Sequence, residues 1–310
     1  RSAGMTFNTP DKELIYLDGS NIFGGECMST ISDRFGNYLI HSNGEELQGK
    51  NLNIIDHLFG IHWSQSEGIV FAPLKNDKFI VFQPVFTNNS INRKYNPPLN
   101  LDDTTGLVYS IFSYDIKNDT LIYDVYKKQL DESFHSEAIQ VTYSVLTNNY
   151  ILIGPDSKGI LKAFEFDLNG NLLRQNSQPF FELNENTNGR DIKINQMGDK
   201  IAINSPAGFF KLPSESEPKH YNSKLFLVDL NAVTLKFYNY KEIILDNYYF
   251  IDIEFSSNSN FLYLCSIEEP INSTSKESIL RYNIRTEKVE TIFNLTVPTN
   301  KDYASQDPPN

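Results

Sequence analysis

The sequence predicts an all-β protein of the β-propeller class, and three observations lead to that prediction. Tyr and Phe supply 17 and 22 residues against a single Trp, a composition that favours strands. An apolar run, a tight polar turn and a second apolar run recur five times along the chain. A second hairpin follows most of these units, and four antiparallel strands repeated about every 40 to 60 residues are typical of propeller blades rather than of a helical solenoid.

The five first hairpins share a short turn rich in Asn, Asp, Gly and Ser. These residues tolerate the left-handed backbone conformations that tight hairpin turns require. The turns lie in the segments TISDRFGN (30–37), FAPLKNDK (71–78), YSVLTNN (143–149), IKINQMGDK (192–200) and IEFSSNSN (253–260).

The second hairpins carry Asp115, Asp167, Asp229 or Asn283 at one repeated position, just before the turn. A ring of carboxylates could bind calcium or serve as acid and base. Each of these residues opens a tight turn, however, where an Asp or Asn side chain caps its own backbone amides. We therefore predict a turn role for them, and the same role for Asp33 in the first hairpin.

The repeats place blades at residues 27–55, 67–128, 139–176, 190–240 and 248–294. Two more strand-like pieces, at 5–8 and 13–17, precede them. We expect these pieces to form the outer strands of a last blade whose inner strands come from the C-terminal end, which would leave no open sheet edge. The prediction is thus a single propeller domain over residues 1–310 with six blades, seven being the alternative.

Loop lengths indicate which end of the blades carries the long connecting segments. Both hairpins of a blade turn at one end, whereas the connections between second and third strands, and those between blades, emerge at the other. The long segments all belong to that second group: 86–107, 205–223 and 267–277 within blades, and 131–138 and 178–190 between them. We expect partners to bind at that end.

Charge and hydropathy narrow the choice of partner. The net charge of −12 disfavours nucleic acid and anionic lipid. No run approaches the roughly 20 apolar residues that a spanning helix needs, so no direct membrane span is predicted. Cys27 and Cys265 lie in apolar, strand-like surroundings and form either two buried thiols or one bridge; burial is the usual fate of a lone Cys and is favoured here.

Motifs for catalysis are missing from the sequence. It contains no GxSxG, HExxH or CxxC and no glycine-rich phosphate loop. The five histidines are scattered, without the paired spacing of metal ligands; they are His41, His57, His62, His135 and His220. We predict no catalytic residue, no metal and no cofactor.

The candidate partner-binding residues are Phe209, Phe210, His220, Tyr221 and Trp63. The two Phe side chains fall in a loop that should be polar, where exposed aromatic residues suit a protein partner. They could equally fold back over the blade below. Trp63 precedes an inner strand and either packs between blades or offers a stacking surface to a sugar or peptide.

Four segments resemble the propeller-like repeat proteins that Bacteroidota export. AGMTFN at 3–8 is similar to an Ala-Gly-Leu-Asp-Phe-Asn mark of that family. GECMSTISD at 25–33, followed by GNYLIHSNG at 36–44, resembles its Glu-Gly-Cys-Ala-Ser-Ile-Ser-Asp and Gly-Asn-Leu-Leu-Phe-Tyr-Thr-Asp-Gly marks. SQSEGIVFAP at 64–73 is similar to Thr-Gln-Ser-Gly-Val-Ile-Val-Pro.

The resemblance covers about the first quarter of the chain. It implies export across the inner membrane and association with the cell surface, with gliding or with the type nine secretion machinery; it supplies no catalytic residues. We therefore expect a non-catalytic, periplasmic or cell-surface propeller that binds a protein, an outer-membrane translocon being one such partner. The alternative is a secreted propeller that binds or cleaves glycans.

Overall fold

A computed structural model provides the structure of the 310-residue chain. It describes residues 2–6, 15–20, 29–33, 36–42, 46–57, 69–85, 106–134, 138–156, 159–179, 191–205, 224–245, 248–271 and 274–298. Their regular structure consists of strands, β1 to β22. Among these residues no helix has the length and hydrophobicity needed to cross a bilayer.

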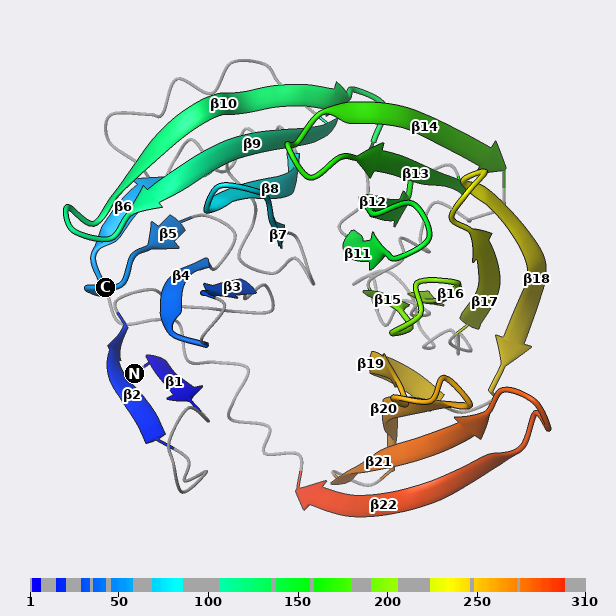
Figure 1. The fold of residues 1–310 in the computed structure, drawn as a ribbon. Coiled ribbons are helices and arrows are strands. Elements are labelled where there is room, and N and C mark those ends of the chain that lie inside the picture. The colour runs from blue at the N-terminus through cyan, green and yellow to red at the C-terminus, as the bar shows by residue number, and fades with distance from the viewer. Residues whose placement is uncertain are drawn as a thin grey trace, which may run out of the picture. The chain divides into compact units, whose positions relative to one another are not determined.

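The chain divides into two compact units, residues 1–182 and 183–310. Each unit contains four-stranded sheets whose strands are hydrogen-bonded antiparallel in chain order. Such a meander is the blade of a β-propeller, so the predicted fold class is confirmed (Figure 1).

The first unit holds a two-stranded sheet and blades 1 to 3. The two-stranded sheet consists of β1 (Ser2–Thr6) and β2 (Ile15–Ser20). Blade 1 consists of β3 (Ser29–Ser32), β4 (Tyr38–Ser42), β5 (Glu46–Gln48) and β6 (Ile54–His57). Blade 2 consists of β7 (Val70–Pro73), β8 (Lys78–Val85), β9 (Gly106–Asp115) and β10 (Thr120–Asp131). Blade 3 consists of β11 (Gln140–Ser144), β12 (Asn149–Pro155), β13 (Ile160–Phe166) and β14 (Leu172–Pro179).

The second unit holds blades 4 and 5. Blade 4 consists of β15 (Asp191–Ile194), β16 (Lys200–Ser205), β17 (Lys224–Asn231) and β18 (Lys236–Ile244). Blade 5 consists of β19 (Tyr248–Phe255), β20 (Phe261–Ile271), β21 (Thr274–Asn283) and β22 (Val289–Pro298). All five blades therefore fall where the repeat in the sequence places them.

The prediction of six or seven blades is wrong for the residues that the structure describes, which form five. The two N-terminal strands are present as expected, but within the described ranges they pair only with each other. The last described strand, β22, runs to Pro298, beyond the predicted end of blade 5 at residue 294, and it is the outer strand of that blade. These residues therefore supply no inner strand to a further blade.

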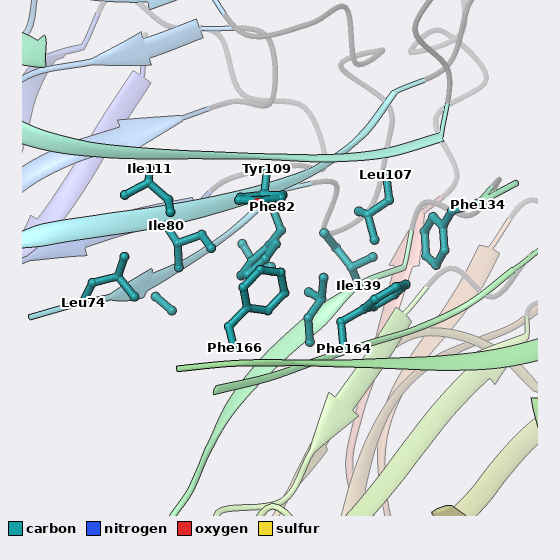
Figure 2. Packing of buried hydrophobic residues seen from close by; sticks show 13 residues of the cluster. Leu74, Ile80, Phe82, Leu107, Tyr109, Ile111, Phe134, Ile139, Phe164 and Phe166 are labelled. Atoms are coloured by element: carbon teal, nitrogen blue, oxygen red, sulfur yellow. The ribbon is translucent and has the colours of Figure 1, made fainter. Parts of the chain in front are cut away.

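Blades within a unit pack face to face. Blades 2 and 3 bury a cluster of thirteen hydrophobic residues between them, shown from close by in Figure 2. At its centre the rings of Phe82 and Tyr109 from blade 2 meet Phe166 from blade 3, with centroids 5.0 and 5.4 Å from the Phe166 ring in edge-on geometry. Burying side chains of this size contributes roughly 1.5–3 kcal/mol each, so this layer holds the two blades together.

The same packing recurs at the other faces. Ile40 and Leu47 of blade 1 pack with Val81 and Phe112 of blade 2. In the second unit, Leu225 and other apolar residues of blade 4 pack with blade 5. Blade 2 is thus covered on both faces by hydrophobic neighbours, as an internal propeller blade must be.

Four tight turns share one geometry, and they occur in both units. Asp33, Asp156, Asp167 and Asn195 each accept, through side-chain Oδ1, the backbone amide four positions later at 2.8–3.0 Å. A glycine three positions after each of them accepts the left-handed conformation, with φ between 72° and 87°. Side-chain acceptor and glycine together specify the reversal of the chain.

The predicted turn roles are confirmed at Asp33, Asp115, Asp167 and Asn283, which accept backbone amides within their own turns. The prediction is wrong at Asp229. There β17 continues for two more residues, and Asn231 accepts the Thr234 amide instead, at 3.0 Å.

Asp229 instead binds two side chains of its own blade. Its carboxylate accepts Lys200 Nζ at 2.7 Å and Asn239 Nδ2 at 2.9 Å. The carboxylate therefore ties β16 and β18 to β17.

Two further expectations about blade 5 are corrected. Residues 267–277 were expected to form a long loop, but the β20–β21 ladder continues to Ile271 and Thr274, so most of this segment is strand. Cys265 was expected to be buried, yet it is an exposed free thiol. It lies on the face of blade 5 away from the buried Leu264, because successive residues of a strand point to opposite faces. Cys27 lies outside the described residues.

Candidate functional site

The five predicted partner-binding residues, Phe209, Phe210, His220, Tyr221 and Trp63, all lie outside the described residues. The strands on either side of the 206–223 segment are described. β16 ends at Ser205 and β17 begins at Lys224, and their ladder runs to that last pair. The segment therefore starts and ends at one end of blade 4, as the loop-length argument requires.

The most exposed apolar pair of the described residues lies at the opposite end of a blade. Val145 and Leu146 form the tip of the β11–β12 turn in blade 3, and they are 83% and 80% exposed. Tyr143, which precedes them, is also exposed. We call Tyr143, Val145 and Leu146 the β11–β12 tip.

Hydrogen bonds hold the tip in this outward position. The Ser144 hydroxyl accepts the Thr147 amide at 3.3 Å, and the Tyr143 hydroxyl bonds Asn148 Oδ1. Asn148 adopts a positive φ of 57°, which closes the turn. The Tyr143 ring packs edge-on against Tyr150, with centroids 5.5 Å apart. The two apolar side chains are thus presented to solvent by an ordered hairpin.

Beneath the tip, a buried carboxylate fastens the strands of blade 3. Glu165 accepts Asn149 Nδ2 at 3.0 Å and forms an ion pair with Arg174. Burial alone would raise the pKa of Glu165, but these hydrogen bonds outweigh it and leave the pKa below its usual value. The hairpin that carries the tip is consequently anchored to β13 and β14.

At the other end of blade 3, a buried lysine joins two blades. Lys162 Nζ lies 2.7 Å from Asp131 Oδ2 and 3.5 Å from Asp156 Oδ2, and it donates to Ser133 Oγ at 2.7 Å. Asp131 is the last residue of β10, so the lysine of blade 3 is bound to the outer strand of blade 2. Every group of this cluster has a protein partner, which indicates a structural role.

A second polar cluster joins blades 1 and 2. The Tyr114 hydroxyl of β9 donates to Asp119 and accepts the Lys50 amide of blade 1 at 2.7 Å. Tyr38 bonds His41 Nδ1 nearby. Burial, followed by the hydrogen bond to Asp119, raises the pKa of Tyr114 to about 12, and burial lowers the pKa of His41. The side chains of Tyr38, His41 and Tyr114 are therefore uncharged near pH 7.

The two described histidines do not meet. His41 is buried in blade 1, whereas His57 is exposed on β6, 3.8 Å from Glu46. His62, His135 and His220 lie outside the described residues. Within the described ranges no group of three His, Cys, Asp or Glu side chains is arranged to hold a metal ion.

The β11–β12 tip was not among the predicted binding residues, although the sequence carries a signal for it. The first-hairpin turns of blades 2 and 5 carry polar residues, whereas the turn at 143–149 places Val145 and Leu146 where Asn, Asp or Gly is usual. An apolar pair at such a position cannot be buried by the hairpin that carries it.

The chain matches no family model and no curated protein. It is similar in structure to a mutant of Synechocystis apocarotenoid oxygenase, at 13% identity and a TM-score of 0.37 over 59% of this chain and 46% of that one. It is also similar to Chaetomium thermophilum Sqt1 bound to the N-terminus of a ribosomal protein, at 10% identity and a TM-score of 0.38 over 70% and 45% of the two chains. The chain therefore spans less than half the length of these two structures.

Proposed function

We propose that the chain is a protein-binding propeller domain with no reaction of its own. The observation that carries this proposal is the β11–β12 tip, where an ordered hairpin holds Val145 and Leu146 83% and 80% exposed. Apolar side chains that are exposed together, rather than singly, mark surfaces that bind another protein.

The chemistry around the tip suggests the kind of partner. Its neighbours in the turn, Ser144, Thr147 and Asn148, are polar and uncharged, as at the rim of a protein interface. The chain as a whole carries a net charge of −12. A partner with an apolar pocket and a neutral or basic surface around it would therefore be favoured.

We further propose that the domain acts outside the cytoplasm, in the periplasm or at the cell surface. The support is the resemblance of residues 3–8, 25–33, 36–44 and 64–73 to exported propeller-like proteins of Bacteroidota. Because the resemblance implies association with the type nine secretion machinery, an outer-membrane protein such as the type nine translocon is the partner to test first.

Affinity purification tests the binding proposal. The tagged full chain is recovered from gently solubilised envelopes of its native host, alongside a Val145→Ser/Leu146→Ser variant. The control is Ile122→Ser, which removes an apolar side chain of 56% exposure from the outer strand of blade 2. We expect the wild type and the control to retain a stoichiometric partner and the double variant to lose it.

A partner retained by the double variant would remove the tip from the proposal. A variant that lacks residues 206–223 then distinguishes the β11–β12 tip from the loop-bearing end of blade 4 as the binding surface. Loss of the partner from that deletion alone would identify the loop-bearing end as the binding surface. If all forms are recovered alone from envelopes that contain the protein, the binding proposal is wrong.

A further inference from the structure

The outer strand of blade 5 differs from the other strands at blade edges. Along β22, Ile292, Phe293 and Leu295 are about half exposed. Among the described residues, β22 pairs only with β21, so its other edge presents backbone N–H and C=O groups without a strand partner.

Charged residues are fewer along β22 than along β10 or β18, because Glu290 near its start is the one charged residue of this strand. β10 carries Asp124, Lys127 and Lys128, β14 carries Arg174, and β18 carries Lys241 and Glu242. Residues 291–298 of β22, by contrast, include no charged residue. Charged side chains on an edge strand oppose pairing with another chain, and β22 lacks that protection over most of its length.

Apolar side chains also gather on one face next to this edge. Ile279 of β21 stands opposite Phe293 of β22 in the ladder, and Cys265 of β20 stands opposite Ile279. All three are exposed. They form a row across three strands that ends at the open edge.

We propose that the β22 edge pairs antiparallel with the β22 edge of a second copy of this chain. Pairing two copies edge to edge in this way requires a two-fold axis normal to the sheet. Such an axis keeps each face of one sheet on the same side as the corresponding face of the other, so paired residues must have sequence numbers whose sum is even. An interface of this kind needs only one surface, which the molecule already carries.

A register centred on Asn294 fits the side chains. Phe293 then lies opposite Leu295 of the second copy, on the face that carries Ile279, and the two-fold axis repeats that aromatic–aliphatic pair. Cross-strand pairs of this type stabilise sheets. No charged residue opposes another between residues 291 and 297.

Asn294 itself lies on the axis, facing its own copy. The Ser278 hydroxyl donates to Asn294 Oδ1 at 2.7 Å and so orients the side-chain amide. Two amides brought together in this way can donate to each other. This polar pair lies on the face opposite Phe293 and Leu295. It favours the register centred on Asn294, because a shift in register would separate the two amides.

Charge explains why the contact is confined to this strand. Two copies of a chain with a net charge of −12 repel each other, so association requires a segment that is uncharged and apolar. The repulsion is screened by salt. Self-association through β22 should therefore strengthen as ionic strength rises, whereas binding of a basic partner should weaken.

Sedimentation equilibrium of the purified full chain is the first test, with Leu295→Lys as the disrupting variant and Ile122→Lys on β10 as the matched control. We expect the wild type and the control to dimerise, with a dissociation constant at least tenfold lower in 0.5 M than in 0.05 M NaCl, and Leu295→Lys to remain monomeric. Circular dichroism establishes that each variant is folded. A monomeric wild type at all concentrations, or a dimer that survives Leu295→Lys, would overturn the proposal.

Disulfide trapping tests the register. In a Cys27→Ser/Cys265→Ser background, Asn294→Cys places a thiol on the axis, where opposed Cα atoms lie about 4.5–5.5 Å apart, within reach of a disulfide. We expect rapid formation of a covalent dimer, and none from Ile122→Cys in the same background. Absence of the cross-link from a chain that sediments as a dimer would overturn the pairing centred on Asn294.

Discussion

Lys162 Nζ lies 2.7 Å from Asp131 Oδ2, and this ion pair joins two blades through residues 31 positions apart. The lysine side chain is only 5% exposed, and Asp156 lies beside it at 3.5 Å. Burial opposes ionisation of Asp131, yet hydrogen bonds from Lys162 and Ser133 keep its pKa below the usual range. One lysine side chain therefore contacts two carboxyl groups where blade 2 meets blade 3.

Replacing Lys162 by Met should destabilise the protein strongly. The apolar volume is retained, but Asp131 and Asp156 are left without their cation in a buried site. Removing one partner of a buried ion pair costs about 3 to 5 kcal/mol, which urea unfolding would measure. Adding Asp131→Asn to the variant should recover part of that loss. An unfolding free energy unchanged by Lys162→Met would show that the cluster does not stabilise the contact between the blades.

His41 should make stability depend on pH under mildly acidic conditions. Burial lowers the pKa of His41 in the folded protein, whereas an unfolded histidine titrates near 6.5. The contribution of neutral His41 is thus fully present above about pH 6.5 and is lost as the pH falls through the lower folded pKa. The free energy of unfolding measured for wild type and for His41→Asn should converge between pH 7.5 and 5. Parallel curves would contradict this assignment.

A larger residue at Gly49 should destabilise the protein while Asp119 is present. A Cβ at Gly49 would collide with the Asp119 carboxylate and meet Ile55 Cγ2 at 3.0 Å. Overpacking of this kind costs about 1–3 kcal/mol, so Gly49→Ala should lower the free energy of unfolding by that amount. Asp119 has a positive φ of 54°, which glycine accepts. In an Asp119→Gly background the cost of Gly49→Ala should therefore fall well below its value in the wild type, and an unchanged cost would exclude the collision.

Much of the fold could be predicted because a blade is a local structure. The pattern that defines a blade, alternating apolar residues and turn residues such as Asp33 and Asp167, is contained within about 40 residues of sequence. This pattern alone places all five blades. The count of six failed because it depended on pairing between distant ends of the chain, which periodicity does not encode. The predicted turn role of Asp229 was wrong for a related reason. Strand β17 runs two residues beyond Asp229, so that Lys200 and Asn239 reach its carboxylate.

The candidate binding surface was harder to predict than the fold. Loop length directed attention to Phe209 and Trp63, because long segments are usually where partners bind. Whether Val145 and Leu146 are exposed depends on the turn that carries them and on the described part of the chain placing no neighbour over that turn. Likewise, the open face beside Ile279 and Phe293 follows from how blade 5 packs, which the strand pattern alone does not determine.

Asn195 provides a final test of how the turns stabilise the second unit. Its buried side chain accepts the Asp199 and Lys200 amides through Oδ1, each at 3.0 Å, and donates from Nδ2 to Asp199 Oδ1 at 2.8 Å and to Ser259 Oγ at 3.0 Å. Because the last bond reaches blade 5, Asn195 links the β15–β16 turn to the next blade. Asn195→Ala removes all four bonds and leaves amides unsatisfied, so a loss of about 2 to 4 kcal/mol in the free energy of unfolding is expected.

Asn195→Asp separates the two halves of this network. The acceptor for the backbone amides remains, but an oxygen replaces Nδ2 opposite the Asp199 carboxylate, and the repulsion raises the pKa of the new acid. Protonation restores a donor, so the stability of the variant is largest at low pH and is lost as the pH rises through that raised pKa. The deficit of Asn195→Asp relative to wild type should accordingly be smaller at pH 4 than at pH 7.5, whereas the deficit of Asn195→Ala should be similar at both. Equal pH dependence of the two variants would mean that Nδ2 contributes nothing, and that the amide-capping bonds alone stabilise the turn.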